Sequence, residues 1–183
     1  AELSEKYETE KEAAAFLEDC KTAIFKVADI QVKPTQKSPA APFTTSTLQQ
    51  EASRKLGFSV SRTMIVAQKL YEAGKITYMR TDSPNLSEEA LGNIQQYINK
   101  SFGNEYSNKK QYASKNSSAQ EAHEGIRPTY IQNPNEGSNR DEERLYDLIW
   151  KRTIASQMSN AKLEKTVAKI DISNRKEKFN AEG

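Results

Sequence analysis

The spacing of apolar residues divides the chain into β-like ends and a helical middle. Residues 22–32 are rich in β-branched and aromatic side chains, and apolar and polar residues alternate over residues 166–172; both features are typical of strands. Between them, apolar residues recur at helical spacing over residues 46–56, 61–73, 87–102 and 141–158, which predicts four helices. The pattern therefore predicts an α+β chain in which a mainly helical domain is inserted into a β-rich domain.

A further helix and a linker are predicted near the N-terminus. Thr9 and Glu12 have the spacing of a capping box, and the apolar residues after them should form one buried stripe on the helix: Ala13, Phe16, Leu17 and Cys20. Residues 33–42 contain three prolines, which favours a linker before the helical domain.

The first half of the helical domain has the outline of a helix-turn-helix with a wing. Ser46 is expected to begin one helix and Gly57 to end it, while Ser61 can cap a second helix that ends at Gly74. The β-prone residues 75–79 then predict a short strand. Further along, the polar residues 103–120 predict a mobile loop, and residues 176–181 predict a last strand.

Composition narrows the classes of protein. The 183 residues carry a net charge of +2, with one cysteine and one histidine, which excludes a disulfide framework and a Cys-based zinc cluster. No apolar run reaches the roughly 20 residues of a membrane span, so we expect a cytoplasmic protein. The absence of an initial Met, and the strand-like pattern at the other end, suggest a piece of a larger protein.

The middle of the chain is basic. Residues 33–80 hold eight Lys or Arg against two Glu, whereas residues 1–20 hold seven acidic residues against two lysines. A basic middle is compatible with a polyanion partner, and equally with a solvated helix face.

Tyr78 and Arg80 are the first candidates for chemistry. In a strand, residues two apart point to one face, so the phenol and the guanidinium could meet the same phosphate. Because a free tyrosine has a pKa of about 10, only roughly 0.1% of it is ionised near neutral pH, and a nearby cation would favour the phenolate. The same spacing also suits a wing tyrosine that packs on a helix beside a surface arginine.

His123 and Arg127 are the second candidates. If this stretch were helical, the two side chains would share a face and could both touch a backbone phosphate. The residues alone favour a surface His123 beside Glu121 and Glu124. The hydroxyl cluster at residues 44–47 could bind phosphate at a helix N-terminus, but helix capping explains it.

Four stretches together resemble the central part of bacterial type IA DNA topoisomerases (topoisomerase I). They are residues 42–52 (PFTTSTLQQEA), 67–74 (AQKLYEAG), 76–83 (ITYMRTDS) and 121–129 (EAHEGIRPT). They occur in the family's order, and the third is close to diagnostic. The resemblance extends over residues 42–158 and, more loosely, over both flanks.

The resemblance implies a mechanism and a role for each residue. Tyr78 would attack single-stranded DNA to give a 5′-phosphotyrosyl intermediate, so that strand passage relaxes negative supercoils without ATP. Arg80 would stabilise the phosphate and the phenolate, and His123 would contact the DNA backbone. Three residues would support the geometry of the site: Thr81, Asp82 and Arg127.

The resemblance also implies the architecture. Residues 43–157 would form a helical, winged-helix-like domain that carries the tyrosine. Residues 1–42 and 158–183 would form part of a β-rich arch domain.

Parts that the family needs for catalysis have no counterpart here. The family binds Mg²⁺ through an acidic cluster in another domain, so we expect no metal ligands in this chain and no activity from it alone. The implied partners are single-stranded DNA and the remaining domains of a monomeric, nucleoid-associated enzyme. The alternative is a non-catalytic winged helix-turn-helix module that binds duplex DNA.

Overall fold

A computed structural model of the chain describes residues 1–112 and 124–183, which form two compact units. One unit comprises Ala1–Lys37 and Ala161–Gly183, and the other comprises Ser38–Asn160. Over the described residues the secondary structure is five α-helices, one short 3₁₀ helix and a four-stranded antiparallel sheet. The predicted α+β class is confirmed at this level.

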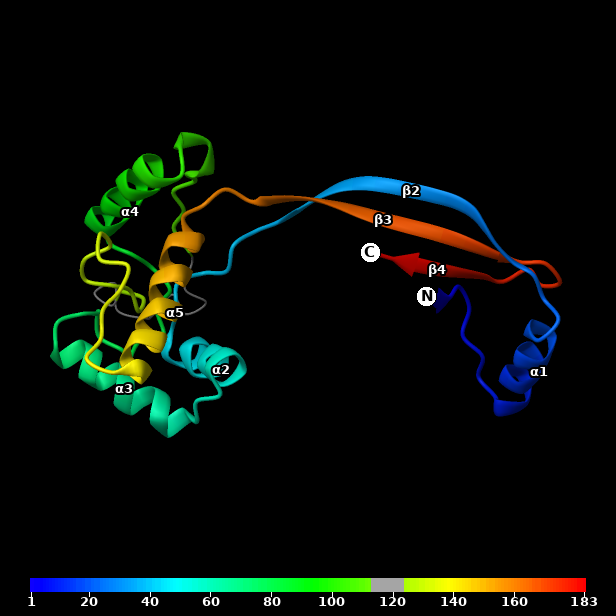
Figure 1. Cartoon of the computed structure of the whole chain (residues 1–183), viewed down its shortest axis with the longest axis horizontal. Helices are drawn as coiled ribbons and strands as arrows, with labels where there is room; N and C mark the ends of the chain where they lie inside the picture. The colour runs from blue at the N-terminus through cyan, green and yellow to red at the C-terminus, as the bar shows by residue number, and fades with distance from the viewer. Residues whose placement is uncertain (113–123) are drawn as a thin grey trace. The chain divides into compact units, whose positions relative to one another are not determined.

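The first unit is the antiparallel sheet with one helix (Figure 1). Its strands are β1 (Glu2–Leu3), β2 (Phe25–Lys37), β3 (Ala161–Ile172) and β4 (Lys178–Glu182), in the order β1-β4-β3-β2. Strand β2 pairs with β3 from Phe25 opposite Ile172 to Lys37 opposite Ala161. Helix α1 (Glu10–Cys20) begins at the predicted capping box of Thr9 and Glu12.

Two predictions in this unit were wrong. The linker predicted from residue 33 starts later, because β2 continues through Pro34 to Lys37; β2 is an edge strand, where a missing N–H can be tolerated. The stripe predicted on α1 is wrong for Leu17 alone, because Phe16 is buried near Tyr7 and Phe179 and both Ala13 and Cys20 are half-buried. Leu17 is 63% exposed.

The second unit contains the remaining helices. These are α2 (Thr45–Leu56), α3 (Val60–Glu72), α4 (Glu88–Ser101), the 3₁₀ helix η1 (Asn104–Tyr106) and α5 (Arg140–Ser156). Gly57 ends α2 in the left-handed conformation, with a φ of 70°, as its position predicted. The N-caps of α2 and α3 are Thr44 and Ser59, two residues before the predicted Ser46 and Ser61.

The core of this unit has two apolar clusters. The larger is formed by α2, α3 and α5 with Phe43, Ile76, Met79 and Ile126. The smaller lies between α4, Ile131 and the end of α5. Trp150 of α5 packs against both clusters, so its environment reports on the whole unit.

Three local predictions here also need correction. Residues 75–79 form no strand but only a bridge between Ile76 and Pro128, since proline cannot extend a ladder of backbone hydrogen bonds. Residues 124–129 are not helical, so the condition under which Arg127 would share a helix face with His123 is not met in the described part of that stretch; Ile126 and Pro128 bridge to other segments instead. Within the predicted loop at 103–120, Asn108 is tied to the backbone of Gln157.

Candidate active site

Burial divides the eight tyrosines of the chain into two groups. Burial raises the pKa of Tyr146 to about 12, and its hydroxyl donates to the carbonyl of Asn133 at 2.6 Å. Burial also raises the pKa of Tyr7 and Tyr112, and both hydroxyls donate to protein oxygens. These three phenols are poor nucleophiles, whereas four tyrosines are exposed: Tyr71, Tyr78, Tyr106 and Tyr130.

Tyr78 lies in a segment without regular secondary structure, in which burial alternates. Met79, Thr81 and Ser83 are buried, whereas the side chains at positions 78, 80 and 82 are exposed. Tyr78, Arg80 and Asp82 are thus the exposed residues of this segment. The phenol and the guanidinium are therefore presented to solvent by the same stretch of backbone.

The first residue of α2 holds this segment on its C-terminal side. The hydroxyl of Thr45 donates to the carbonyl of Met79 at 2.8 Å and accepts from the amide of Thr81 at 2.9 Å. The amide of Thr45 donates in return to the carbonyl of Thr81 at 2.9 Å. Thr45, at the start of α2, thus fixes the backbone on either side of Arg80.

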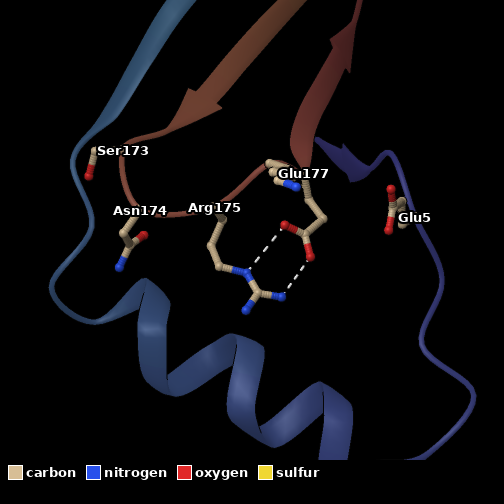
Figure 2. Close-up of a pocket in the computed structure, with 6 residues that line it drawn as sticks. Glu5, Ser173, Asn174, Arg175 and Glu177 are labelled. Carbon is tan, nitrogen blue, oxygen red and sulfur yellow. Dashed lines mark hydrogen bonds and ion pairs between the residues drawn. The ribbon is translucent and has the colours of Figure 1, made fainter.

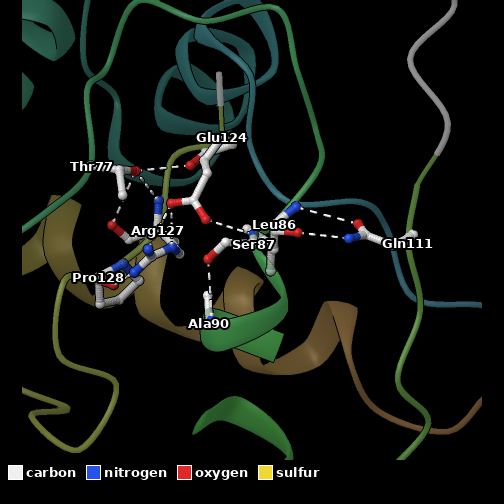
Figure 3. A network of polar contacts seen from close by, with 9 residues as sticks. Thr77, Leu86, Ser87, Ala90, Gln111, Glu124, Arg127 and Pro128 are labelled. Atoms are coloured by element: carbon white, nitrogen blue, oxygen red, sulfur yellow. Dashed lines mark hydrogen bonds and ion pairs between the residues drawn. The ribbon is translucent and has the colours of Figure 1, made fainter. Parts of the chain in front are cut away.

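Thr77 holds the segment on its N-terminal side (Figure 3). Its hydroxyl donates to the carbonyl of Gly125 at 2.8 Å, and its amide donates to the carbonyl of Arg127 at 2.9 Å. The amide of Arg127 donates back to the Thr77 hydroxyl at 3.0 Å. Tyr78 therefore sits between two hydrogen-bonded anchors while its own side chain projects outward.

The side chain of Arg127 is committed to the protein. Its Nη2 and Nε donate to Oε2 of Glu124 at 2.6 and 3.0 Å, and Nη1 donates to the carbonyl of Pro128 at 3.0 Å. The other oxygen of Glu124 accepts from the amide of Ser87 at 2.6 Å, at the start of α4. Figure 3 shows this network, which joins α4 to the segment that anchors Thr77.

Opposing effects act on Glu124. Burial raises its pKa, but the hydrogen bond from Ser87 and the charge of Arg127 together hold it below the ordinary value. Glu124 is therefore ionised near neutral pH and neutralises the guanidinium of Arg127. Arg127 supports the site from within and has no free charge to offer a phosphate.

The other predicted residues fall into separate groups. The side chains of Tyr78, Arg80 and Asp82 form no hydrogen bond or ion pair with any other residue that the structure describes. Thr81 is buried and its hydroxyl accepts from the amide of Ser83 at 3.1 Å. His123 lies outside the described residues.

Sequence reasoning missed four residues that shape the site: Thr45, Tyr71, Thr77 and Glu124. Thr45 and Thr77 lie within the motifs that the sequence singled out, but only their partners reveal their roles. The ring of Tyr71 lies 5.2 Å from that of Tyr78, centroid to centroid. Its position seven residues before Tyr78, in the last turn of a predicted helix, was the available signal.

Comparison with known proteins shows the family of the chain. The family model described as DNA topoisomerase matches residues 1–183, the whole chain. The chain belongs to the DNA topoisomerase family. It is 48% identical to DNA topoisomerase 1 of Pseudomonas aeruginosa over 88% of its length, and 49% identical over 86% to "DNA topoisomerase 1 type prokaryotic" of Acanthamoeba polyphaga mimivirus.

A solved topoisomerase has the same fold. The structure of full-length topoisomerase I from Thermotoga maritima matches 99% of this chain with a TM-score of 0.77 and 36% identity. These matches confirm the resemblance to bacterial topoisomerase I. The chain spans 19% of the length of both sequence relatives and 31% of the solved chain, so it corresponds to one segment of a topoisomerase.

A second polar cluster lies in the sheet unit of this topoisomerase segment (Figure 2). A cavity of about 630 Å³ borders the turn after β3, where Arg175 pairs with Glu177 at 2.6 Å and with Asp19 at 3.0 Å. Hydrogen bonds from Arg175 and Tyr7 lower the pKa of Glu177 to about 2. Because two carboxylates already neutralise Arg175, this cluster ties α1 to the β3–β4 turn.

The described residues contain neither a metal-binding cluster nor a membrane-spanning helix. Over residues 1–112 and 124–183, no group of three or more His, Cys, Asp or Glu side chains is arranged to hold a metal ion. In the same part of the chain, no helix combines the length and the apolar character needed to cross a membrane.

Proposed function

We propose that this chain supplies the nucleophile of a type IA topoisomerase. The Oη of Tyr78 attacks a phosphodiester of single-stranded DNA, a P–Oη bond forms and the P–O3′ bond breaks. The phenol gives up its proton and the departing 3′ oxygen takes one up, which leaves a 5′-phosphotyrosyl bond. Attack by the 3′-hydroxyl reverses the step after another strand has passed, and one ester replaces another without ATP.

The observation that carries this proposal is the exposed pair on an anchored segment. Tyr78 and Arg80 are presented together by backbone that Thr45 and Thr77 hold on both sides. Because the Arg80 guanidinium has no partner among the described residues, it is available to a phosphate, where it can offset the charge that develops in the transition state.

The remaining site residues take supporting roles in this proposal. His123 contacts the DNA backbone. Thr81 and Arg127 hold the geometry through the hydrogen bonds described above, and Asp82 belongs to the same exposed run as Tyr78. The enzyme's Mg²⁺ is bound by residues outside this chain.

We also propose how the two units correspond to the family's domains. Residues 43–157 form the tyrosine-bearing domain, and residues 1–42 and 158–183 belong to the β-rich arch. The α2–turn–α3 arrangement supports a relation to winged-helix folds, with residues 75–79 in the place of the wing. The proposed setting is a monomeric cytoplasmic enzyme that acts at the nucleoid.

A single substitution tests the nucleophile. In the full-length protein that carries this segment, Tyr78→Phe should abolish the covalent adduct with a labelled single-stranded oligonucleotide while leaving noncovalent binding intact. Tyr130→Phe is the matched control, because that tyrosine is 63% exposed and lies outside the proposed machinery. If the Tyr78→Phe enzyme still forms the adduct, the proposal is wrong, and a preference for duplex DNA would favour the winged helix-turn-helix alternative.

The isolated chain provides a second test. With Mg²⁺ and an oligonucleotide, the 183 residues should form no covalent adduct, because the metal-binding part is missing. Its DNA affinity should be weak and should fall steeply with salt, since its net charge is only +2. Recovery of adduct from the chain alone, or tight binding that salt does not weaken, would contradict this assignment.

A further inference from the structure

Tyr71 makes the one ring contact of Tyr78 among the described residues. The two ring centroids are 5.2 Å apart and the ring planes are inclined by 63°, so one ring presents its edge to the other. This geometry is the preferred one for an aromatic pair, because the positive edge of one ring meets the negative face of the other. Tyr71 and Tyr78 are 40% and 44% exposed, so the contact lies at the protein surface.

The backbone of Tyr71 is held firmly. It lies in the last turn of α3, next to the buried Leu70. The amide of Gly74 donates to the carbonyl of Tyr71 at 2.8 Å, and the amide of Lys75 donates to the carbonyl of Leu70 at 2.8 Å. Gly74 adopts a φ of 68°, a conformation that glycine adopts readily. The end of α3 is thus followed directly by the anchored segment that contains Tyr78.

Backbone anchoring alone does not orient the phenol. The hydroxyl of Tyr78 has no hydrogen-bond partner in residues 1–112 and 124–183, and the side chain is nearly half exposed. A free phenol would sample several rotamers, and only some of them would aim Oη at a bound phosphate. A neighbouring ring fixed on a helix end can restrict these rotamers.

We propose that Tyr71 is a positioning residue that holds the ring of Tyr78 in the orientation for attack. This inference rests on the proposed function, because it gives Tyr71 a task only if Tyr78 is the nucleophile. The aromatic ring of Tyr71 does this work, since its hydroxyl also lacks a hydrogen-bond partner in the described part of the chain. Phenylalanine should therefore replace it and an aliphatic side chain should not.

The test measures cleavage separately from binding in the full-length enzyme. Single-turnover formation of the covalent adduct is followed at saturating single-stranded oligonucleotide, and Kd is measured by fluorescence anisotropy without Mg²⁺. Tyr71→Phe should cleave within about twofold of the wild-type rate, and Tyr71→Leu about three- to tenfold more slowly, the range expected for one partly exposed aromatic pair. Neither change should alter Kd by more than about twofold.

Three outcomes would overturn the proposal. They are a Tyr71→Leu enzyme that cleaves at the wild-type rate, a Tyr71→Phe enzyme as slow as Tyr71→Leu, and a defect that appears wholly in Kd. If Tyr71→Leu fails to fold, Tyr71→Met takes its place, with the same expected slowing. Tyr78→Phe serves as the reference: an adduct from that enzyme refutes the proposed function itself, whereas its absence beside normal cleavage by Tyr71→Leu refutes only the role of Tyr71.

Discussion

Replacement of Arg127 by methionine should destabilise the helical unit without removing any group from the exposed face of the site. The change deletes the three hydrogen bonds that the guanidinium donates to Glu124 and Pro128. It also leaves the carboxylate of Glu124 without its counter-charge. Methionine keeps much of the aliphatic length, so the loss comes from charge and hydrogen bonding rather than from a cavity.

The size of the effect follows from the exposure of the pair. The side chains of Arg127 and Glu124 are 18% and 26% exposed, so the pair is neither fully exposed nor fully buried. Its contribution to stability should therefore lie between the values for those two cases. An exposed ion pair contributes roughly 0–1 kcal/mol, and removal of one partner of a fully buried pair costs about 3–5 kcal/mol. We therefore expect Arg127→Met to lower the free energy of unfolding by about 2 kcal/mol.

Trp150 provides the assay. It is the only tryptophan of the chain, and its Nε1 donates to the carbonyl of Ile131 at 2.9 Å within the same unit. Urea denaturation followed by Trp150 fluorescence therefore reports on this unit. The matched control is Lys151→Met, which breaks an ion pair with Asp147 whose side chains are 67% and 44% exposed and should cost less than about 0.5 kcal/mol.

The pH dependence gives a further check. The pKa of Glu124 is below its ordinary value of 4.5 in the folded state, so its contribution to stability is present above that value. The contribution is lost as the pH falls through the lower folded-state pKa, and the difference between wild type and Arg127→Met should narrow there. A cost near that of Lys151→Met, or one that does not change in acid, would refute the reasoning.

Two further predictions concern other parts of the fold. Glu177→Gln should destabilise the sheet unit near neutral pH, because the pKa of Glu177 is lowered to about 2 in the folded state. The difference in stability from wild type should vanish as the pH falls from 4.5 toward 2. Hydrogen exchange of the β4 amides can measure this difference. Gly57→Ala should destabilise the helical unit by about 1 kcal/mol, because Gly57 has a φ of 70°. Gly92→Ala should stabilise the same unit by roughly 0.5–1 kcal/mol, because Gly92 lies in the interior of α4 and no atom lies within 4 Å of an added Cβ. Equal effects of the two changes in urea denaturation would rule out the backbone explanation.

Features set by local sequence were largely predictable. The capping box at Thr9 and the left-handed Gly57 appear where the sequence placed them, because a helix cap is made by residues three or four apart. Tyr78 and Arg80 are both exposed, as the i, i+2 spacing predicted, although the strand on which that prediction rested is not formed. The resemblance of residues 76–83 to the family's motif added the expected roles of the two side chains as nucleophile and phosphate-binding cation.

Tertiary structure decided which residues hold the segment of Tyr78 and Arg80. Thr77 meets Gly125, 48 residues later, and Thr45 meets Thr81, 36 residues later, and no spacing rule predicts either contact. Those contacts replaced the expected wing strand by a single bridge between Ile76 and Pro128. The charge of Arg127 is neutralised by Glu124 because folding places them against the start of α4. Local propensity therefore determined the helices and the exposed pair, and long-range hydrogen bonds determined how the pair is held.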